Sequence, residues 1–191
     1  DGRKLVFLAK EQVDESVEDL RDKGFDQQIY EEDWQPTRVW IAAIDPDATT
    51  PSPDAEARML ELAGSASDVQ WSPNGQDLMV VLAPTPSVDD SYMQKRVHVV
   101  DSESGRVIRS LNNPGKLGQV RWSPDGKRIV YSVNLFKDEW DIWVMDAQGK
   151  NRQPLVSTRA VELAPDWSPD GKAIIFQSTR AGNNDIWIIP S

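Results

Sequence analysis

The side chains best suited to hold a charged ligand are two adjacent glutamates, Glu31 and Glu32, in the stretch Tyr-Glu-Glu-Asp-Trp at Tyr30–Trp34. Paired carboxylates suit a cation, because charge-assisted hydrogen bonds are stronger than neutral ones. The same residues are equally consistent with a solvated acidic loop, since runs of like charge are usually exposed. Substrate binding by Glu31 and Glu32 is therefore one of two interpretations, and we favour the acidic loop.

Residues for hydrolytic catalysis are not found. The Gly-x-Ser-x-Gly pentapeptide, whose strained turn presents a serine nucleophile, does not occur. The only histidine, His98, lies in an apolar stretch where the other repeats carry tryptophan, so we interpret it as a packing residue and not as the base of a triad. We expect no catalytic residue here; whether a longer parent protein is an enzyme stays open.

Metal and cofactor sites are not expected either. The chain contains no cysteine, which excludes a disulfide framework, a thiolate nucleophile and cysteine-ligated zinc. Asp45 and Asp146 end apolar stretches, and neither matches the spacing of a calcium loop. The sequence thus predicts a protein without metal and without cofactor.

The charge balance limits the possible partners. The 191 residues include 21 basic and 31 acidic side chains, for a formal net charge of −10, and no basic patch stands out. A nucleic-acid partner is therefore not expected. No apolar run approaches the roughly 20 residues that span a bilayer, so membrane insertion is not expected. Most of the excess charge lies in residues 11–33, where ten acidic and two basic residues give a local balance of −8.

A turn that occurs three times marks the strands that would position any site. Trp-Ser-Pro-Asp-Gly-Lys stands at Trp122–Lys127 and Trp167–Lys172, and Trp-Ser-Pro-Asn-Gly-Gln at Trp71–Gln76. Pro presets φ, Asp or Asn supplies a side-chain hydrogen bond, Gly adopts positive φ, and Trp fills the space between repeats. We therefore assign a structural and not a ligand-binding role to the repeat-turn residues Trp71, Trp122, Asp125, Gly126, Trp167, Asp170 and Gly171.

The repeat length indicates the fold. The three tryptophans that open the turns are 51 and 45 residues apart, close to the period of about 40–50 residues of propeller blades. Each turn leads into an apolar run, a polar connection and a second apolar run, and the pattern reads as four short antiparallel strands. The second runs are apolar on almost every residue, which indicates that both faces of the sheet are covered. We predict an all-β fold, a β-propeller.

The chain is expected to form a single propeller domain or fragment, residues 1–191, with about four blades. Blade 1 covers about residues 1–64 and carries a short helical acidic insertion at 11–33; the other blades cover about 65–115, 116–158 and 159–191. The first blade lacks its innermost strand and the last its outermost. These two partial blades do not complement each other, so we expect a part of a larger propeller or a ring that closes by assembly.

Two local features of the first blade are also predicted. Two extra residues between Arg38–Ala42 and Asp45 suggest a β-bulge. Val13, Val17 and Leu20 are spaced as one face of a helix that Gly24 would end. We favour a helix whose apolar stripe caps the propeller; the alternative is a docking element for another domain or a partner.

Taken together, the Trp-Ser-Pro-Asp-Gly-Lys turns, the loop Ser178–Trp187 and the Asp-Ile-Trp-Val-Met-Asp strand resemble the propeller repeats of TolB and of the prolyl oligopeptidase family. Two stretches, Glu31–Asp45 and Leu82–Lys127, are similar to the non-catalytic propellers of acylaminoacyl-peptidase-like and dipeptidyl-peptidase-like serine peptidases. In that family the propeller precedes an α/β-hydrolase domain, covers its active site and restricts access to small peptides.

The resemblance implies a non-catalytic propeller that gates and positions peptide substrates for a hydrolase domain outside this chain. The alternative is a TolB-like periplasmic scaffold for protein interaction. The implied partners are an α/β-hydrolase domain of the same parent chain or another protein, with a peptide as substrate. An exported location, periplasmic or secreted, is favoured over a cytoplasmic one.

The same resemblance bears on the two glutamates. Tyr-Glu-Glu resembles the stretch with which dipeptidyl peptidase propellers hold the ammonium group of a substrate, which would assign that role to Glu31 and Glu32. Here, however, it leads into Arg38–Ala42 and not into a strand with the Trp-Ser-Pro turn. That departure puts the carried-over role in doubt.

Overall fold

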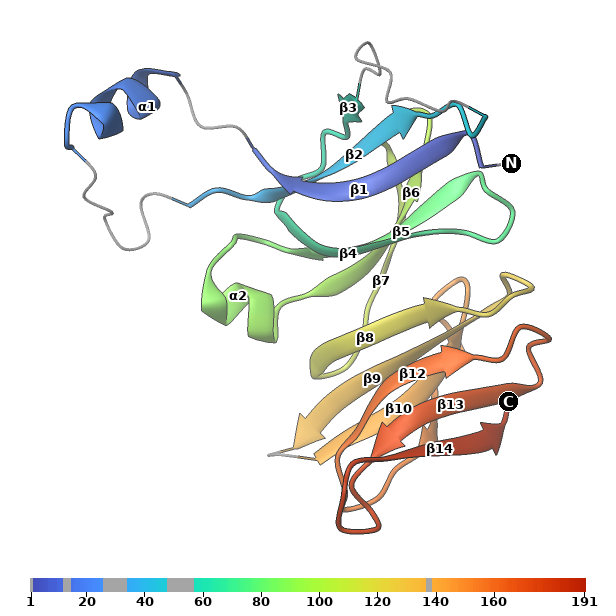
Figure 1. Cartoon of the computed structure of the whole chain (residues 1–191). Helices are drawn as coiled ribbons and strands as arrows, with labels where there is room; N and C mark the ends of the chain where they lie inside the picture. Colours follow the sequence, from blue (N-terminus) through green and yellow to red (C-terminus); the bar gives the residue numbers. More distant parts are fainter. Residues whose placement is uncertain (1, 12–14, 26–33, 48–56, 137–138) are drawn as a thin grey trace.

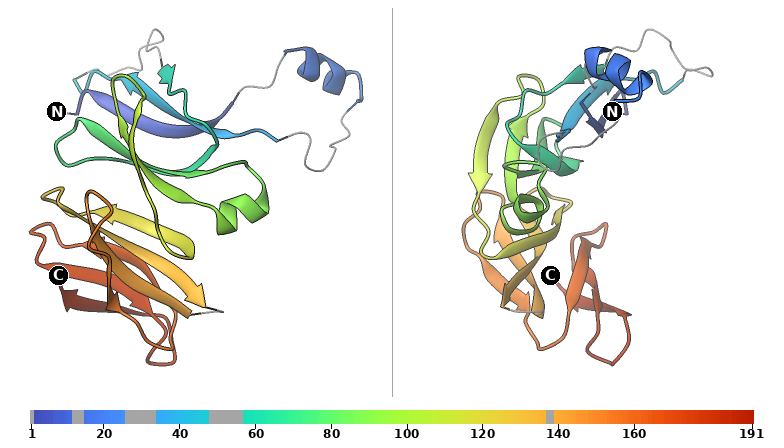
Figure 2. Two further views of the ribbon diagram at one scale, coloured as in Figure 1. Left: turned by 180° about the vertical axis from the view of Figure 1, so that it is seen from behind. Right: turned by 90° about the vertical axis from the view of Figure 1, so that its left-hand side faces the viewer.

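The computed structural model describes residues 2–11, 15–25, 34–47, 57–136 and 139–191. Its strands form four antiparallel sheets (Figure 1). The sheets follow one another along an arc, so that sheets adjacent in the sequence are adjacent in space (Figure 2). This arrangement confirms the predicted all-β fold, a partial β-propeller.

Each sheet is a meander in which consecutive strands pair. The first sheet contains β1 (Lys4–Lys10), β2 (Thr37–Ala43) and β3 (Ala57–Met59). The second contains β4 (Ser65–Trp71), β5 (Asp77–Ala83), β6 (Arg96–Asp101) and β7 (Val107–Leu111). The third contains β8 (Lys116–Trp122), β9 (Arg128–Phe136), β10 (Glu139–Asp146) and β11 (Gln153–Val156). The fourth contains β12 (Glu162–Trp167), β13 (Ala173–Ser178) and β14 (Asp185–Pro190).

The incomplete blades at the two ends are as predicted. The first sheet begins with the strand that follows a turn, because Gly2 adopts φ 68°, as Gly126 does at φ 70°, and β1 pairs with β2 as β9 pairs with β10. The fourth sheet ends with its third strand, β14. The sheets at the two ends of the arc therefore lack different strands of a four-stranded blade.

The predicted bulge in the first blade is wrong. The pairing of β1 with β2 runs without a register shift from Lys10↔Thr37 to Lys4↔Ala43. The amide of Ile44 then donates to the carbonyl of Arg3 at 2.9 Å, as Ala147 does to Lys127 in the third sheet. Ala43, and not Asp45, therefore occupies the position of Asp146, and the extra residues lie beyond the strand.

The core consists of three apolar layers, one between each pair of neighbouring sheets. On β2, β6 and β10, alternate residues point to the next sheet, as expected for a pleated strand. Ile142 and Val144 on β10 are buried in this way against the fourth sheet. The equivalent residues of the last sheet, Ile186 and Ile188, are 71% and 68% exposed. The outer face of β14 therefore has the composition of a blade interface without a neighbour among the described residues.

Two short helices stand at the same end of the first two sheets (Figure 1). Helix α1 (Glu15–Asp22) lies between β1 and β2, and helix α2 (Val88–Met93) between β5 and β6. The α1 helix was predicted, and Gly24 follows it with φ 88°. The expectation that its apolar stripe caps the propeller is wrong for the residues described, since Val17 is 38% and Leu20 49% exposed.

Candidate functional site

The meander topology creates two ends of the propeller that differ in character. We call the turn face the end that carries the three Trp-Ser-Pro turns, at residues 71–76, 122–127 and 167–172. We call the crossover face the opposite end, where second strands connect to third strands and where the chain passes to the next sheet. Helix α1 lies between β1 and β2, which pair as β9 and β10 do, and α2 lies between β5 and β6, so both helices belong to the crossover face.

The polar groups of each repeat turn are satisfied within the turn. Ser123 donates its hydroxyl hydrogen to Asp125 Oδ1 at 2.6 Å, and its oxygen accepts from the amide of Arg128 at 2.9 Å. The amide of Lys127 donates to the same Asp125 oxygen at 3.0 Å. The Ser123 hydroxyl and the Lys127 amide together hold the pKa of Asp125 below its usual value. Gly126 completes the turn with φ 70°.

The other two turns repeat this network. Ser168 and Asp170 make the same contacts, at 2.6 Å from hydroxyl to carboxylate, and the Ser168 hydroxyl holds the pKa of Asp170 low. In the remaining turn Asn74 stands in place of the aspartate and accepts from Ser72 and from the amide of Gln76. The network therefore needs a side-chain oxygen at this position but not a charge.

Consecutive turns also touch one another. A Cβ placed on Gly126 would lie 3.6 Å from the ring of Pro73, and one on Gly171 would lie 3.7 Å from Pro124. Trp167 donates its indole hydrogen to the carbonyl of Arg121 at 3.3 Å. The indole nitrogen of Trp122 is buried and has no hydrogen-bond partner among the described residues. These contacts favour the structural role assigned to the repeat-turn residues.

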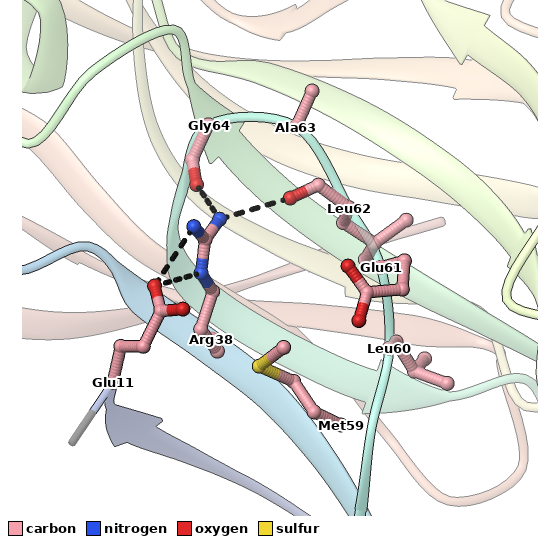
Figure 3. Close-up of a pocket in the computed structure, with 8 residues that line it drawn as sticks. All are labelled: Glu11, Arg38, Met59, Leu60, Glu61, Leu62, Ala63 and Gly64. Atoms are coloured by element: carbon pink, nitrogen blue, oxygen red, sulfur yellow. Dashed lines mark hydrogen bonds and ion pairs between the residues drawn. The ribbon is translucent and has the colours of Figure 1, made fainter.

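The crossover face is different, because the acidic insertion is attached there through Arg38. Arg38 Nε donates to Glu11 Oε2 at 3.0 Å, and Nη2 lies 2.9 Å from the same oxygen in an ion pair. Nη1 donates to the carbonyls of Leu62 and Gly64 at 3.1 and 3.0 Å (Figure 3). The amide of Glu11 donates to the carbonyl of Pro36 at 3.2 Å. Arg38 thereby joins both stems of the insertion to the segment that leads into the second sheet.

A pocket of about 320 Å³ opens beside this contact. Its lining consists of Glu11, Arg38, Met59, Leu60, Glu61, Leu62, Ala63 and Gly64 (Figure 3). Glu61 is exposed and makes no hydrogen bond or ion pair with another described residue. With one arginine and two glutamates, the pocket has a formal charge of −1, which suits a cationic group better than an anionic one.

The two glutamates singled out from the sequence, Glu31 and Glu32, lie outside the described residues, so their role stays a hypothesis. The sequence analysis did not find the Glu11–Arg38 pair. The signal available for it was weak: an arginine at the start of a strand and an acid at the start of the charged stretch, 27 positions apart.

His98 lies within the sheet, as its sequence context suggested. It pairs with Val80 on β5 in the register that joins Tyr131 to Trp143 and Phe176 to Trp187 in the later sheets. Its Nδ1 lies 2.9 Å from the hydroxyl of Ser110, directly opposite on β7. Burial lowers the pKa of His98 below the ordinary histidine value. No contact with a carboxylate, the third member of a triad, is seen among the described residues.

Neither a metal cluster nor a membrane-spanning helix occurs in the described part of the chain. In those residues no group of three or more histidine, aspartate or glutamate side chains could hold a metal ion. The helices resolved in the same ranges include none that is long and apolar enough to cross a membrane.

Comparison with known proteins identifies the repeat type. The profile of the family described as TolB beta propeller domain matches residues 71–191. The peptidase YuxL of Bacillus subtilis, itself uncharacterised, is 24% identical over 111 residues, which cover 58% of this chain and 17% of that protein. The Tol-Pal system protein TolB of Anaeromyxobacter sp. is 32% identical over 58 residues, which cover 30% of this chain and 13% of that protein.

A solved structure with the same fold covers the whole chain. The β-propeller domain of the Trilobed protease from Pyrococcus furiosus superposes on 100% of this chain and 52% of its own length, with a TM-score of 0.55 and 10% sequence identity. At that identity the likeness concerns the fold alone. This chain spans less than a fifth of the length of either curated relative named above.

Proposed function

Because the chain belongs to the family of TolB β-propeller domains, we propose that it is the non-catalytic propeller of a serine peptidase of the prolyl oligopeptidase family. In this role the propeller gates and positions peptide substrates for a hydrolase domain outside these residues. The proposal draws on the relationship to propellers of peptidases as well as to TolB. In this proposal the catalytic groups come from the hydrolase domain.

The observation that carries the proposal is the attachment of the acidic insertion at the crossover face. The turn face is occupied by turns whose polar atoms bond to one another. On the crossover face, by contrast, Arg38 holds Glu11 in place beside a pocket with an unpaired Glu61. Exposed apolar side chains on α1 and α2, including Leu20 and Tyr92, give the same face surface for a neighbouring domain.

The proposal is tested in the parent protein. Replacement of Arg38 by Met removes the bonds that hold the insertion stem, while the propeller core is untouched. We expect hydrolysis of peptides too long for the native gate to rise relative to hydrolysis of a dipeptide substrate. Arg106→Gln, an exposed arginine on the turn face, is the matched control. A parent chain without a Gly-x-Ser-x-Gly hydrolase domain, or an unchanged size preference in Arg38→Met, would contradict the proposal.

A TolB-like interaction scaffold remains the second candidate, because the family match covers residues 71–191 and a TolB protein is among the relatives. Such a scaffold would act by binding a protein partner and would need no hydrolase domain. The parent sequence separates the two candidates. For either one we propose an exported protein, periplasmic or secreted.

A further inference from the structure

A second pocket on the crossover face, at the fourth sheet, has a lining of unusual charge. Its volume is about 400 Å³, and its lining consists of Thr158, Arg159, Ala160, Thr179 and Arg180. Two arginines and two threonines therefore line one small space, although the chain has a formal net charge of −10. The pocket beside Arg38 has the opposite formal sign.

Arg180 is held in a fixed position. Its Nε donates to the Ser178 hydroxyl at 3.0 Å, and its Nη2 donates to Glu162 Oε1 at 3.2 Å. Its guanidinium carbon lies 4.8 Å from the ring centroid of Trp187 and 5.1 Å from that of Phe176. A guanidinium that is already ordered loses little further entropy when it binds a ligand.

The acid that holds Arg180 is fully buried. Glu162 is 0% exposed, and its Oε1 also accepts from the Thr158 hydroxyl at 2.6 Å. Its Oε2 is buried and has no donor among the described residues. Glu162 pairs with Ser178 in the register in which Leu117 pairs with Val133, so a charge stands where the preceding sheet has leucine. A buried acid at an apolar position is costly, and here it fixes two members of the pocket lining.

Several donors of the pocket are left for a ligand. Arg180 Nη1 and the whole guanidinium of Arg159 make no hydrogen bond to other described residues. The Thr179 oxygen accepts from the amide of Val161 at 3.0 Å, which leaves its hydroxyl hydrogen available. With two arginines and one glutamate, the formal charge around the pocket is +1, so the free donors call for an acceptor with negative charge.

We propose that this pocket binds a small oxyanion, and that in the function proposed above the oxyanion is the terminal carboxylate of a peptide. The planar fork of an arginine matches a carboxylate or a phosphate through two parallel hydrogen bonds. Arg180 supplies a donor fixed by its ion pair, Arg159 an exposed donor and Thr179 a neutral hydroxyl. The anion site stands on the pocket alone; its assignment to a peptide rests on the proposed function.

The test uses the 191-residue chain and three probes. These are acetyl-Ala-Ala with a free carboxylate, the same peptide as its terminal amide, and inorganic phosphate. Binding is followed by titration calorimetry and by the NMR signal of the Trp187 indole, which stacks on Arg180. We expect the carboxylate to bind and the amide to bind about tenfold more weakly or not at all, because a charge-assisted contact is lost.

Matched variants locate the site. Arg159→Gln should weaken carboxylate binding about tenfold, and Arg159→Lys should restore part of it, since the charge but not the fork returns. Arg106→Gln, an exposed arginine on the turn face, should leave binding unchanged. Arg159 is exposed, so these substitutions are not expected to unfold the chain.

Each outcome bears on the proposal. Equal binding of acid and amide, no binding of any probe, or an unchanged affinity in Arg159→Gln would overturn the anion site. Phosphate bound far more tightly than the carboxylate would support the site and overturn its assignment to peptides. None of these results depends on a hydrolase domain, so failure here is distinguishable from failure of the gating proposal.

Discussion

Arg109 on β7 donates a hydrogen bond of 3.1 Å to the carbonyl of Ala147 in the next sheet. Arg58 on β3 makes the equivalent contact, at 2.8 Å, with the carbonyl of Ser102. The equivalence follows from the register, because Arg58 lies opposite Ile41 and Arg109 opposite Val99, one position after Trp40 and His98. A cross-blade arginine clasp is thus repeated at the outer edge of successive sheets.

This clasp should contribute to stability. We expect Arg109→Met to lower the free energy of unfolding by about 1–2 kcal/mol, because a charged donor to a half-buried carbonyl is lost. Urea denaturation measures the change. Arg106→Met, which removes an exposed arginine from the neighbouring turn, should stay within about 0.5 kcal/mol of the parent chain. Equal losses in both variants would argue against the clasp.

The Glu162–Arg180 pair offers a sharper test. Arg180→Met leaves a fully buried carboxylate without its cation, which we expect to cost about 3–5 kcal/mol. The double replacement Glu162→Leu with Arg180→Met should recover most of this loss, since Leu117 fills the same register position in the third sheet. Thermal unfolding of the single and double variants gives the coupling. A double variant no more stable than Arg180→Met would contradict this account.

The repeat turns predict how stability depends on pH. Hydrogen bonds from Ser123 and Ser168 lower the pKa of Asp125 and Asp170 in the folded chain. A lowered folded-state pKa gives stability that is present above the unfolded pKa and is lost as the pH falls through the folded pKa. Asp125→Asn with Asp170→Asn should flatten this acid limb, measured by urea unfolding at successive pH values, and preserve the fold at neutral pH, because Asn74 already serves one turn. An unchanged acid limb would mean that other carboxyl groups control it.

Shortening a side chain on the outer face of β14 should change the free energy of unfolding only slightly. Ile142 on β10 is 0% exposed and Ile186 at the equivalent position is 71% exposed. We expect Ile142→Ala to cost about 2–5 kcal/mol and Ile186→Ala less than about 1 kcal/mol. The two free energies of unfolding, measured on the 191-residue chain, decide the point. A comparable loss in Ile186→Ala would show that this face is covered in solution.

Much of the fold was readable from the sequence. The turns at Trp71, Trp122 and Trp167 carry their own hydrogen-bonding groups, and the strands that follow are apolar runs of the right length. Both signals are local, so they fixed the repeat, the antiparallel strand order and the strands missing at each end. Two predictions for the first blade, the bulge and the capping helix, were wrong. Both concern the part of the chain where the repeat pattern is interrupted, so they were based on residue spacing alone and not on comparison with another repeat.

The candidate sites were less accessible to sequence reasoning. Glu31 and Glu32 stood out because they are adjacent, whereas Glu11 and Arg38 meet only because β1 and β2 pair. Glu162 reads as an ordinary acid in the sequence, and its burial beside Arg180 depends on the neighbouring sheet.

The sequence by itself therefore determined the architecture, which consists of repeated short strands joined by turns whose polar groups hydrogen-bond within the turn. It also showed an acidic insertion and the absence of a nucleophile elbow. The tertiary structure alone decided which charges meet, which apolar residues stay exposed and where pockets form. The physical reason is that turn chemistry and strand pattern act over a few consecutive residues, whereas ion pairs and pockets depend on how separate sheets are stacked.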